Sequence, residues 1–393
     1  MKYDFIINGG GVAGLSLAMY MNENDFFSDK KILIIEPNDK NTNDKTFCFW
    51  DTKKSFFEDI IYKKWNKIGF FHPQFESNID LNNYTYNMIR AIDFYQYCQK
   101  KLNQNKNITF LKEKSIVWGS TQEGGYVTTE SGTFEAQWIF SSINLKTKST
   151  QLQKKQYHYY LQHFKGWTIQ TKKDVFDEQV ATFMDFRLPQ RKAEVCFMYL
   201  LPASKRESLV EYTIFGREIL EQKVYENEIL TYIHQRLGLE VDEYEIKEIE
   251  WGVIPMFDEP FIQKPSAFVM NIGAVGGATK SSTGFTFHNI QKQTQRIINN
   301  LIKTSIPFDN ANFLKKRFSL YDSMLLEVME SEQLKGADIF KMMFEKHKVE
   351  KILRFLDDES NFLEELQIMY SVPSPPFIAA FFRLLKKGYF KIT

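Results

Sequence analysis

The chain has 393 residues, enough for two domains or for one elaborated domain with a sizeable core. Its 43% hydrophobic and 25% charged residues are close to globular averages, which excludes a disordered chain and a coiled coil. Fifty basic against 49 acidic side chains give a net charge of +1, so no overall attraction to nucleic acid is expected. Cys48, Cys98 and Cys196 lie far apart, so neither a disulfide framework nor a zinc site is predicted.

The first 36 residues have the pattern of a dinucleotide-binding βαβ unit. Residues 3–8 predict a buried strand, residues 9–14 a glycine turn, residues 15–21 a helix, and residues 31–35 a second strand. In such a unit the glycines permit a tight turn and a close approach to a pyrophosphate, and an acid about 20 residues later binds ribose hydroxyls. The predicted cofactor-binding residues are therefore Gly9, Gly11, Val12, Ala13, Gly14 and Glu36.

A second segment rich in small residues favours FAD over a nicotinamide cofactor. Residues 270–277 predict an apolar strand that opens into small residues, and apolar side chains follow at helical spacing between Phe287 and Leu301. An N-terminal fingerprint completed by a segment near the C-terminal third is common in FAD domains that another domain interrupts. We therefore expect Gly273, Gly276 and Gly277 to bind the flavin cofactor; the alternative is an ordinary buried strand–turn–helix.

The rest of the chain predicts an α/β (α+β overall) fold. Residues 1–104 and 250–305 are assigned to a discontinuous, Rossmann-like FAD-binding domain, and residues 105–249 to an inserted, mostly antiparallel substrate-binding domain. Residues 306–393 are assigned to a helical C-terminal region. The β-like runs of the insertion are residues 115–119, 125–129, 133–140, 181–186, 195–200 and 208–215.

The C-terminal helix predicted between Phe377 and Tyr389 is aromatic and ends in basic residues. Such a helix is suited to the interface of a bilayer, although a helix that caps a core has the same pattern. No apolar run approaches the roughly 18 residues of a membrane span, and the N-terminus lacks the features of a signal peptide. We expect a cytoplasmic protein with peripheral contact to the inner face of the cell membrane.

Several motifs occur in an order that resembles the FAD-dependent lycopene cyclases of carotenoid biosynthesis, of the bacterial type. Residues 43–50 are similar to the family's N-D-x-T-W-C-F-W segment, with Phe47 in place of the usual tryptophan. Residues 273–285 resemble the family's closing flavin motif. Further similar segments are residues 86–94, 161–167, 184–187 and 199–202.

The resemblance implies a lycopene β-cyclase, which converts the linear ends of lycopene into β-ionone rings to give γ-carotene and then β-carotene. The implied reaction is an acid-initiated isomerisation without net redox change, with FAD in its reduced form and NADPH or NADH as the reductant. One alternative is a redox flavoprotein of the same fold, such as an aromatic hydroxylase or a prenyl-chain reductase. Another is a flavin- or carotenoid-binding protein without activity.

The predicted catalytic acid is Glu211, a lone carboxyl group among apolar neighbours on a predicted strand. It also resembles the family's acid motif, in which a second acid follows the glutamate; here that place holds Tyr212. The alternative for Glu211 is a solvent-facing glutamate paired with Lys205 or Arg206. Asp185 is a candidate second acid or base, or else a structural partner of Arg187.

Arg90 is a candidate ligand of the flavin or its phosphates, the alternative being an ordinary surface arginine. Trp50, Trp167 and Trp251 are candidates to line a polyene tunnel, or else belong to the core. The six histidines form no metal pair in the sequence, so structural roles are expected for them and no metal is proposed.

Overall fold

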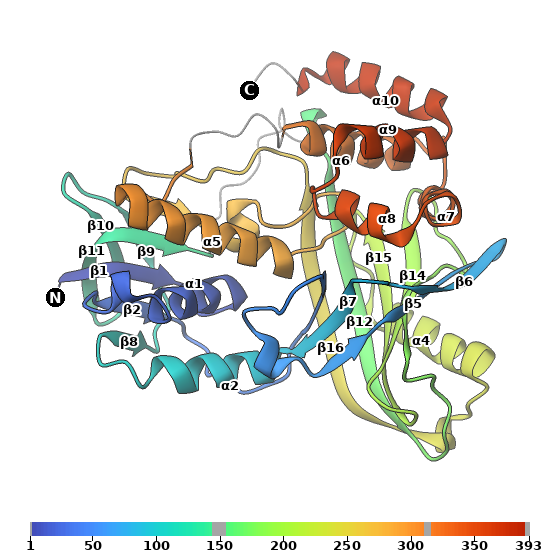
Figure 1. Cartoon of the computed structure of the whole chain (residues 1–393), viewed down its shortest axis with the longest axis horizontal. Helices are drawn as coiled ribbons and strands as arrows, with labels where there is room; N and C mark the ends of the chain where they lie inside the picture. Colours follow the sequence, from blue (N-terminus) through green and yellow to red (C-terminus); the bar gives the residue numbers. More distant parts are fainter. Residues whose placement is uncertain (1, 144–154, 310–315, 390–393) are drawn as a thin grey trace.

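The computed structural model describes residues 2–143, 155–309 and 316–389, which form two large sheets side by side and a group of helices at one end (Figure 1). The first sheet carries the N-terminus and lies at the left of Figure 1, and the second lies at the right. A small three-stranded sheet, β3-β7-β4, connects them; its strands are β3 (Thr46–Asp51), β7 (Thr85–Arg90) and β4 (Lys63–Trp65).

The first sheet confirms the predicted βαβ unit. Strand β1 pairs in parallel with β2 on one side and with β11 on the other, and β17 adds in parallel beyond β11. The predicted strand at 270–277 is therefore part of the same sheet, which explains why a segment so late in the sequence completes the domain. The strand order is β8 (Ile108–Leu111), β2 (Ile32–Ile35), β1 (Lys2–Asn8), β11 (Gly132–Ser141), β10 (Gly125–Thr129) and β9 (Val117–Ser120), with β17 (Val269–Asn271) beside β11.

Helices cover this sheet and bury its apolar side chains. Helix α1 follows the glycine turn directly, and α5 packs beside it although the two are more than 260 residues apart in the chain. Helix α5 has the apolar face that the sequence predicts, since Ile290, Ile297, Ile298 and Leu301 are all buried. The covering helices are α1 (Val12–Asn22), α2 (Ala91–Leu102) and α5 (Phe287–Thr304), with the short turns η1 (Asp25–Phe27), η2 (Glu58–Ile60) and η4 (Gly273–Gly276).

The second sheet has seven strands, mostly antiparallel, and places successive side chains on opposite faces. On β15, Val210, Tyr212 and Ile214 pack under α4, whereas Leu209 and Phe215 face the other core. The order is β16 (Tyr244–Phe257), β12 (Tyr159–Thr171), β15 (Glu207–Gly216), β14 (Val195–Pro202), β13 (Val180–Asp185), β5 (Lys67–His72) and β6 (Phe75–Asp80), with α4 (Gln222–Leu237) and η3 (Val241–Glu243).

These pairings correct the predicted domain boundaries. Strands β9, β10 and β11, which were assigned to the insertion, belong to the first sheet, because β11 pairs with β1. Strands β5 and β6, which were assigned to the FAD-binding domain, belong to the second sheet, because β5 pairs with β13. The second sheet also extends past residue 249, to Phe257 at the end of β16. Local patterns predict strands but not their partners, which is why the elements were right and the boundaries were wrong.

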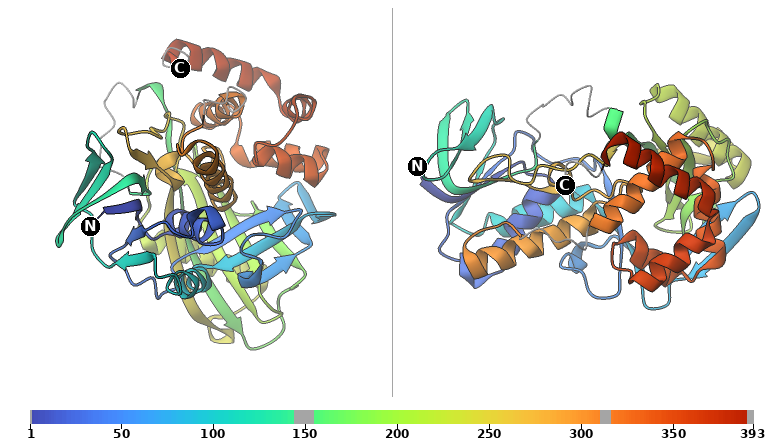
Figure 2. Two further views of the ribbon diagram at one scale, coloured as in Figure 1. Left: turned by 60° about the vertical axis from the view of Figure 1, so that its left-hand side comes forward. Right: turned by 90° about the horizontal axis from the view of Figure 1, so that it is seen from above.

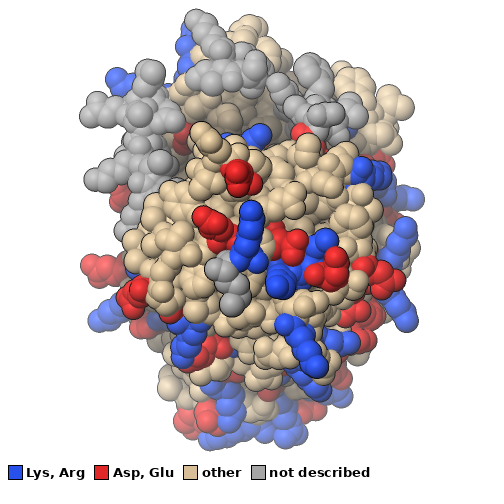
Figure 3. All heavy atoms as spheres, turned by 90° about the vertical axis from the view of Figure 1, so that its left-hand side faces the viewer, with Lys and Arg blue, Asp and Glu red and all other residues tan. Residues whose placement is uncertain are grey.

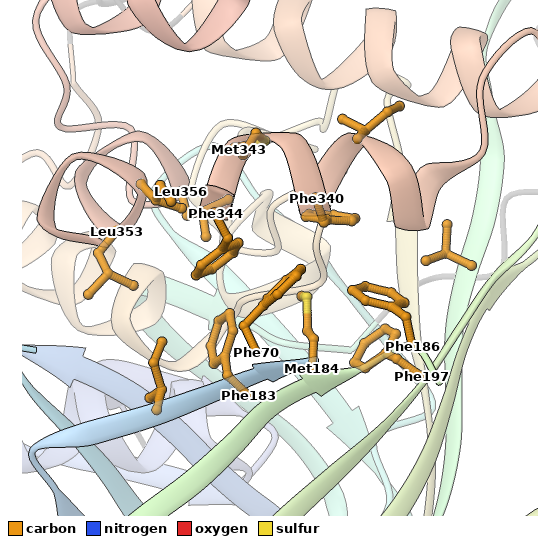
Figure 4. Close-up of a cluster of buried hydrophobic side chains, with 14 of the residues drawn as sticks. Phe70, Phe183, Met184, Phe186, Phe197, Phe340, Met343, Phe344, Leu353 and Leu356 are labelled. Atoms are coloured by element: carbon orange, nitrogen blue, oxygen red, sulfur yellow. The ribbon is translucent and has the colours of Figure 1, made fainter. Parts of the chain in front are cut away.

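The C-terminal helices cover the face of the second sheet that lies opposite α4 (Figures 1 and 2). Figure 4 shows aromatic side chains of the sheet meeting α7, with the Phe70 and Phe344 rings stacked 4.3 Å apart. In the described part of the chain no single helix is long and apolar enough to span a membrane; α9 and α10 together pass that test but are bent by 114°. The helices are α6 (Lys316–Glu330), α7 (Gly336–Lys346), α8 (Val349–Leu356), α9 (Phe362–Ser371) and α10 (Ser374–Lys387).

Figure 3 shows the face of the molecule that includes the N-terminal sheet. Acidic and basic side chains are interspersed on it and do not gather by sign. This agrees with the net charge of +1.

Candidate functional site

The glycine turn between β1 and α1 forms a cradle suited to a dinucleotide pyrophosphate. A methyl group added at Gly11 would meet no protein atom within 4 Å, so the backbone there borders open space. One added at Gly14 would lie 2.0 Å from the Gly9 carbonyl oxygen, so only glycine lets the helix start this close to the strand. The N-terminus of α1 thus presents free backbone N–H groups beside an open volume, which suits a phosphate.

Glu36 fixes the other side of this cradle. Its carboxylate accepts hydrogen bonds from the backbone N–H of Gly10 at 2.8 Å and from the backbone N–H of Asn38 at 3.1 Å. The acid at the end of β2 is therefore held against the glycine turn, where the sequence predicts it for ribose binding. The Asn38 side-chain amide also donates to Oε1 at 3.0 Å, and Lys40 Nζ lies 3.7 Å from that oxygen, so Oε2 is the oxygen with a lone pair left for a ribose hydroxyl.

Residues 273–285, the closing segment, pack directly onto this turn. A methyl group added at Gly273 would lie 2.7 Å from the Cβ of Ala13, so the two predicted cofactor segments touch. The side chain of Gln293 on α5 accepts from the Gly273 N–H at 2.8 Å and donates to the Gly276 carbonyl at 3.0 Å, which holds the turn in place. Gly277 has φ +77°, a conformation that favours glycine.

A Gly11→Ala variant is expected to fold but to lose most of its bound FAD. The added methyl group has space in the protein, yet it occupies the place where a pyrophosphate must approach the backbone. The measurement is the ratio of flavin to protein absorbance after purification, with the thermal unfolding of the flavin-free protein as the control for folding. A variant that retains FAD at the wild-type ratio would contradict this position of the phosphates.

Arg90 lies at the end of β7, where its guanidinium forms a bidentate ion pair with Asp93 at 2.7 and 2.9 Å. It also stacks over the Tyr62 ring, 4.2 Å from its centroid. These contacts account for its half-buried position, and they do not connect it with the glycine turn. Its contact with a flavin stays a prediction.

A cavity of about 120 Å³ lies where the small sheet, the second sheet and the closing segment meet. Glu211 is the carboxylic acid in its wall, and most of the wall is aromatic or aliphatic. The residues after η4 form the side toward the FAD-binding domain. The lining includes Phe47, Cys48, Tyr86, Phe164, Tyr199, Leu201, Leu209, Ile254, Phe285 and Phe287.

Glu211 is buried, as expected for an acid that is protonated near neutral pH. Burial raises its pKa well above the ordinary value, and the negative charge of Glu250 raises it further. The Thr213 hydroxyl donates to its Oε1 at 2.8 Å. The alternative of a solvent-facing glutamate paired with Lys205 or Arg206 does not hold, because Arg206 instead pairs with Asp174 and Glu211 has no cationic partner among the described residues.

Glu250 on β16 is the acid that the sequence analysis missed. Gly166 on β12 pairs with Glu211 on one side and with Glu250 on the other. Because Gly166 has no side chain, the two carboxyl groups meet across it and form a hydrogen bond. Four glutamates between residues 243 and 250 have similar surroundings in the sequence, so nothing local distinguishes this one.

The sequence matches the model of a known protein family. The family model described as lycopene cyclase protein matches residues 4–381, nearly the whole chain. The chain belongs to the lycopene cyclase family. None of the curated proteins matches the sequence.

Several solved structures share this fold, among them a flavin-dependent enzyme. A geranylgeranyl bacteriochlorophyll reductase-like protein from Thermoplasma acidophilum superposes with a TM-score of 0.63 at 11% identity, over 98% of this chain and 99% of that one. The flavin-dependent brominase Bmp2 gives 0.62 at 11% identity, over 91% and 94% of the two chains. The p-nitrophenol 4-monooxygenase PnpA from Pseudomonas putida gives 0.56 at 12% identity, over 98% and 97%. At 11–12% identity these likenesses show a shared fold.

The family-like segment at residues 43–50 has a structural role in the site. The Asn43 amide donates to Glu248 at 2.6 Å, and the Thr46 hydroxyl donates to Glu250 Oε2 at 2.8 Å. Phe47 lines the cavity and stacks on Phe287 with centroids 5.5 Å apart. The segment thus holds the acidic strand β16 and closes the apolar wall, and phenylalanine fills the place of the family's tryptophan.

The structure separates Asp185 from Glu211. The Asp185 carboxylate is fully buried and is bound by the Arg187 guanidinium at 2.7 and 2.9 Å and by the Tyr232 hydroxyl at 2.9 Å. It is not part of the cavity wall, so the structural alternative describes it and the assignment as a catalytic acid is corrected. Local sequence shows the neighbouring Arg187 but not the tyrosine from α4 that completes the pairing.

The tryptophan candidates also lie outside the cavity wall. Trp50 belongs to the main core, Trp167 packs under α4 on the opposite face of the sheet, and Trp251 is 41% exposed. Tyrosine and phenylalanine rings line the cavity instead. Trp167 follows Gly166 directly, so strand alternation alone turns it away from the site.

Proposed function

We propose that this member of the lycopene cyclase family is a lycopene β-cyclase, which isomerises the linear ends of lycopene to β-ionone rings, giving γ-carotene and then β-carotene. The observation that carries the proposal is the buried Glu211, an acid in a predominantly apolar cavity beside the flavin-type domain. Cyclisation of a hydrocarbon needs a proton donor and no other polar recognition, and this cavity offers that combination.

In the proposed reaction the Glu211 O–H bond breaks as its proton moves to the terminal double bond of the polyene. The neighbouring double bond attacks the resulting cation and closes the ring. A proton then leaves the ring and returns to a carboxylate of the site, so atoms and electrons balance without an oxidant. The rings of Tyr86, Phe164 and Tyr199 and the negative charge shared by the carboxyl pair favour the cationic intermediate.

FAD fits the cradle of Gly11, Gly14, Glu36 and Gly273 described above. Bound there in its reduced form, for which NADPH or NADH is the proposed electron donor, it would supply further negative charge. The chain's own part is to close the apolar cavity against water through Phe285 and Phe287, which follow the closing segment. Water exclusion matters because a carbocation in contact with water is captured as an alcohol.

A second cavity is the proposed site for the rest of the long polyene. It measures about 310 Å³ and lies between α6, α7, α9 and α10. Ser282 borders this cavity and Phe285 borders the first, so the two cavities flank one short loop. Its lining is almost entirely apolar and includes Met324, Leu325, Ile339, Met343, Ile368 and Val372.

Peripheral membrane contact through α9 and α10 completes the proposal, since lycopene dissolves in membranes and not in water. These helices lie at the outer edge of the molecule, and Tyr370, Ile378 and Phe382 are 80%, 54% and 57% exposed. Large apolar side chains that are exposed together mark an interaction surface. We therefore propose that these helices contact the inner face of the cell membrane, with the second cavity beneath them.

A Phe382→Asp variant is expected to bind phosphatidylethanolamine–phosphatidylglycerol vesicles roughly 10- to 150-fold more weakly than the wild type, because one buried aromatic side chain contributes roughly 1.5–3 kcal/mol. Flotation with the vesicles measures the bound fraction. The control is Phe26→Asp, which removes a 42% exposed phenylalanine from the N-terminal domain. Equal weakening by both variants would contradict contact through α10.

The function is tested by expression in a bacterium engineered to accumulate lycopene, followed by chromatography of the extracted pigments. The expected result is conversion to a bicyclic isomer of unchanged mass. The competing function is a redox flavoenzyme, in keeping with the reductase-like protein and the monooxygenase of the same fold. Unchanged lycopene beside a well-expressed, FAD-loaded protein, together with substrate-dependent NAD(P)H consumption, would favour that function instead.

A further inference from the structure

The contact between Glu211 and Glu250 is unusual because neither carboxyl group has a cationic partner. Both side chains are buried, at 7% and 6% exposure. Among the ion pairs of the described residues, none involves either group. Two buried carboxylates this close cannot both be ionised without a large cost, so the pair holds a proton.

The hydrogen bonds of the pair require the same proton. Each carboxyl group accepts one hydroxyl, from Thr213 in the case of Glu211 and from Thr46 in the case of Glu250, both at 2.8 Å. Glu250 Oε1 is buried and receives no hydrogen bond from an N–H or hydroxyl group of the described residues. This oxygen faces Gly166, since a Cβ atom added to Gly166 would lie 3.2 Å from it. A proton on the Glu211 carboxyl group, on the other side of Gly166, supplies the missing donor.

Only one member of the pair borders the cavity. Glu211 is part of the cavity wall, whereas Glu250 lies behind it on the outer strand β16. Burial raises the pKa of both groups, but the hydrogen bonds from Glu211 and Thr46 favour the anionic form of Glu250. The Glu211 pKa is raised well above its ordinary value. Glu250 Oε1 is the buried oxygen that lacks a donor, so the proton is assigned to Glu211, which faces the cavity, and the negative charge to Glu250 behind it.

We infer that Glu250 is a positioning residue that acts through Glu211: its anion holds the proton on the cavity-facing carboxyl group and accepts a hydrogen bond from it until the substrate takes the proton. This inference rests on the proposed function and deepens it by assigning the second carboxyl group of the site. Gly166 is part of the same arrangement, because the absence of a side chain at this position lets the two carboxyl groups approach each other.

The second carboxyl group cannot come from the position after Glu211. Tyr212 packs under α4 on the opposite face of the sheet, so an acid at residue 212 would point away from the cavity. A residue two strands away supplies the group instead, and the segment at residues 43–50 holds it through Thr46.

The test is the pH dependence of cyclisation by the reduced, FAD-loaded enzyme, for wild type and Glu250→Gln. The acid must be protonated, so activity falls as the pH rises through the Glu211 pKa. Glutamine keeps the shape and a hydrogen-bonding group but removes the negative charge, which lowers that pKa. The descending limb is expected to move about 1–3 pH units toward acid. The matched control is Glu245→Gln, an exposed glutamate on the same strand, for which the limb stays in place.

A second variant and a second readout keep the inference open to refutation. Gly166→Ala places a methyl group 3.0 Å from Glu250 Cγ and 2.8 Å from Leu209 Cδ1, so it is expected to separate the carboxyl groups and to shift the limb in the same direction. The infrared C=O band of a protonated carboxyl group, followed against pH, reports the proton without any substrate. This band is expected at neutral pH in the wild type, and only at lower pH in the Glu250→Gln variant.

The outcomes separate the inference from the function. A wild type that does not cyclise lycopene but keeps the pH-dependent infrared band, shifted in Glu250→Gln, would overturn the proposed function and retain the carboxyl pair. An active wild type whose descending limb and infrared band are unchanged by Glu250→Gln would overturn the inference. A uniform loss of turnover at every pH, without a shift, would also overturn it, since that is the effect of a purely structural residue.

Discussion

Glu211→Gln is expected to reduce cyclisation of lycopene by about 10²–10⁴-fold while the protein keeps its fold and its FAD. This is the usual contribution of a positioned general acid. Glutamine has nearly the same shape, and its amide oxygen can still accept the Thr213 hydroxyl. It has no acidic proton for the double bond, and it removes one of two buried acids that disfavour each other. Stability is therefore expected to be unchanged or higher.

The measurement is the initial rate of ring formation, with the flavin content and thermal unfolding of each preparation determined in parallel. Glu207→Gln is the matched control, because Glu207 lies at the start of the same strand, outside the cavity wall, and accepts from the Tyr62 hydroxyl at 2.9 Å. The control is expected to cyclise at the wild-type rate. An active Glu211→Gln enzyme would mean that another group donates the proton and that the cavity is not the active site.

The sequence predicts the parts of the site that depend on one stretch of chain. The βαβ unit, the glycine turn and Glu36 are local in sequence, and the structure confirms that β1, α1 and β2 form as predicted. Glu211 on a half-apolar strand is also a local pattern, and its burial confirms the predicted environment. Alternation along a strand is sufficient for such predictions, because it fixes which side chains share a face.

Contacts between distant strands are the part that sequence reasoning does not reach. Glu250 is two strands away from Glu211, and the pairing passes through Gly166, which has no side chain to mark it. Asp185 is the reverse case. In the sequence it looks like a catalytic acid, but in the structure its carboxylate is bound by Arg187 and Tyr232. In both cases the deciding neighbour comes from another element, so the single strand carries no sign of it.

His158 marks a second buried polar cluster, away from the cavity wall. Its Nδ1 lies 2.7 Å from Asp258, and its Nε2 lies 2.9 Å from Glu327 and 3.1 Å from Glu330. The same carboxylates bind cations. Glu327 pairs with Arg383 and Lys387 of α10, and Glu330 pairs with Lys387 and with Arg217 on the segment after β15. We interpret the cluster as an ion-pair network that ties β12, α6 and α10 together, in agreement with the structural role expected for this histidine.

His158→Gln is expected to lower the free energy of unfolding by about 3–5 kcal/mol, because it leaves the Asp258 and Glu327 carboxylates buried with one partner fewer. Denaturant unfolding followed by tryptophan fluorescence measures the difference. His234→Gln is the control, since that histidine is 62% exposed at its side chain and pairs only with the exposed Glu240, 3.3 Å away. The control is expected to change stability by less than about 1 kcal/mol.

The pH dependence of this difference identifies its origin. Burial opposes a charge on His158, but the hydrogen bonds that the ring donates to Asp258, Glu327 and Glu330 outweigh it and raise the His158 pKa from 6.5 to about 10. A pKa raised on folding stabilises the folded state fully below the unfolded value and loses its effect as the pH rises through the folded value. The gap between wild type and His158→Gln is thus widest near pH 6.5 and closes toward pH 10. A gap that is constant over this range would mean that the cluster stabilises the fold by packing and not by charge, and α10 would then owe its position to its apolar contacts alone.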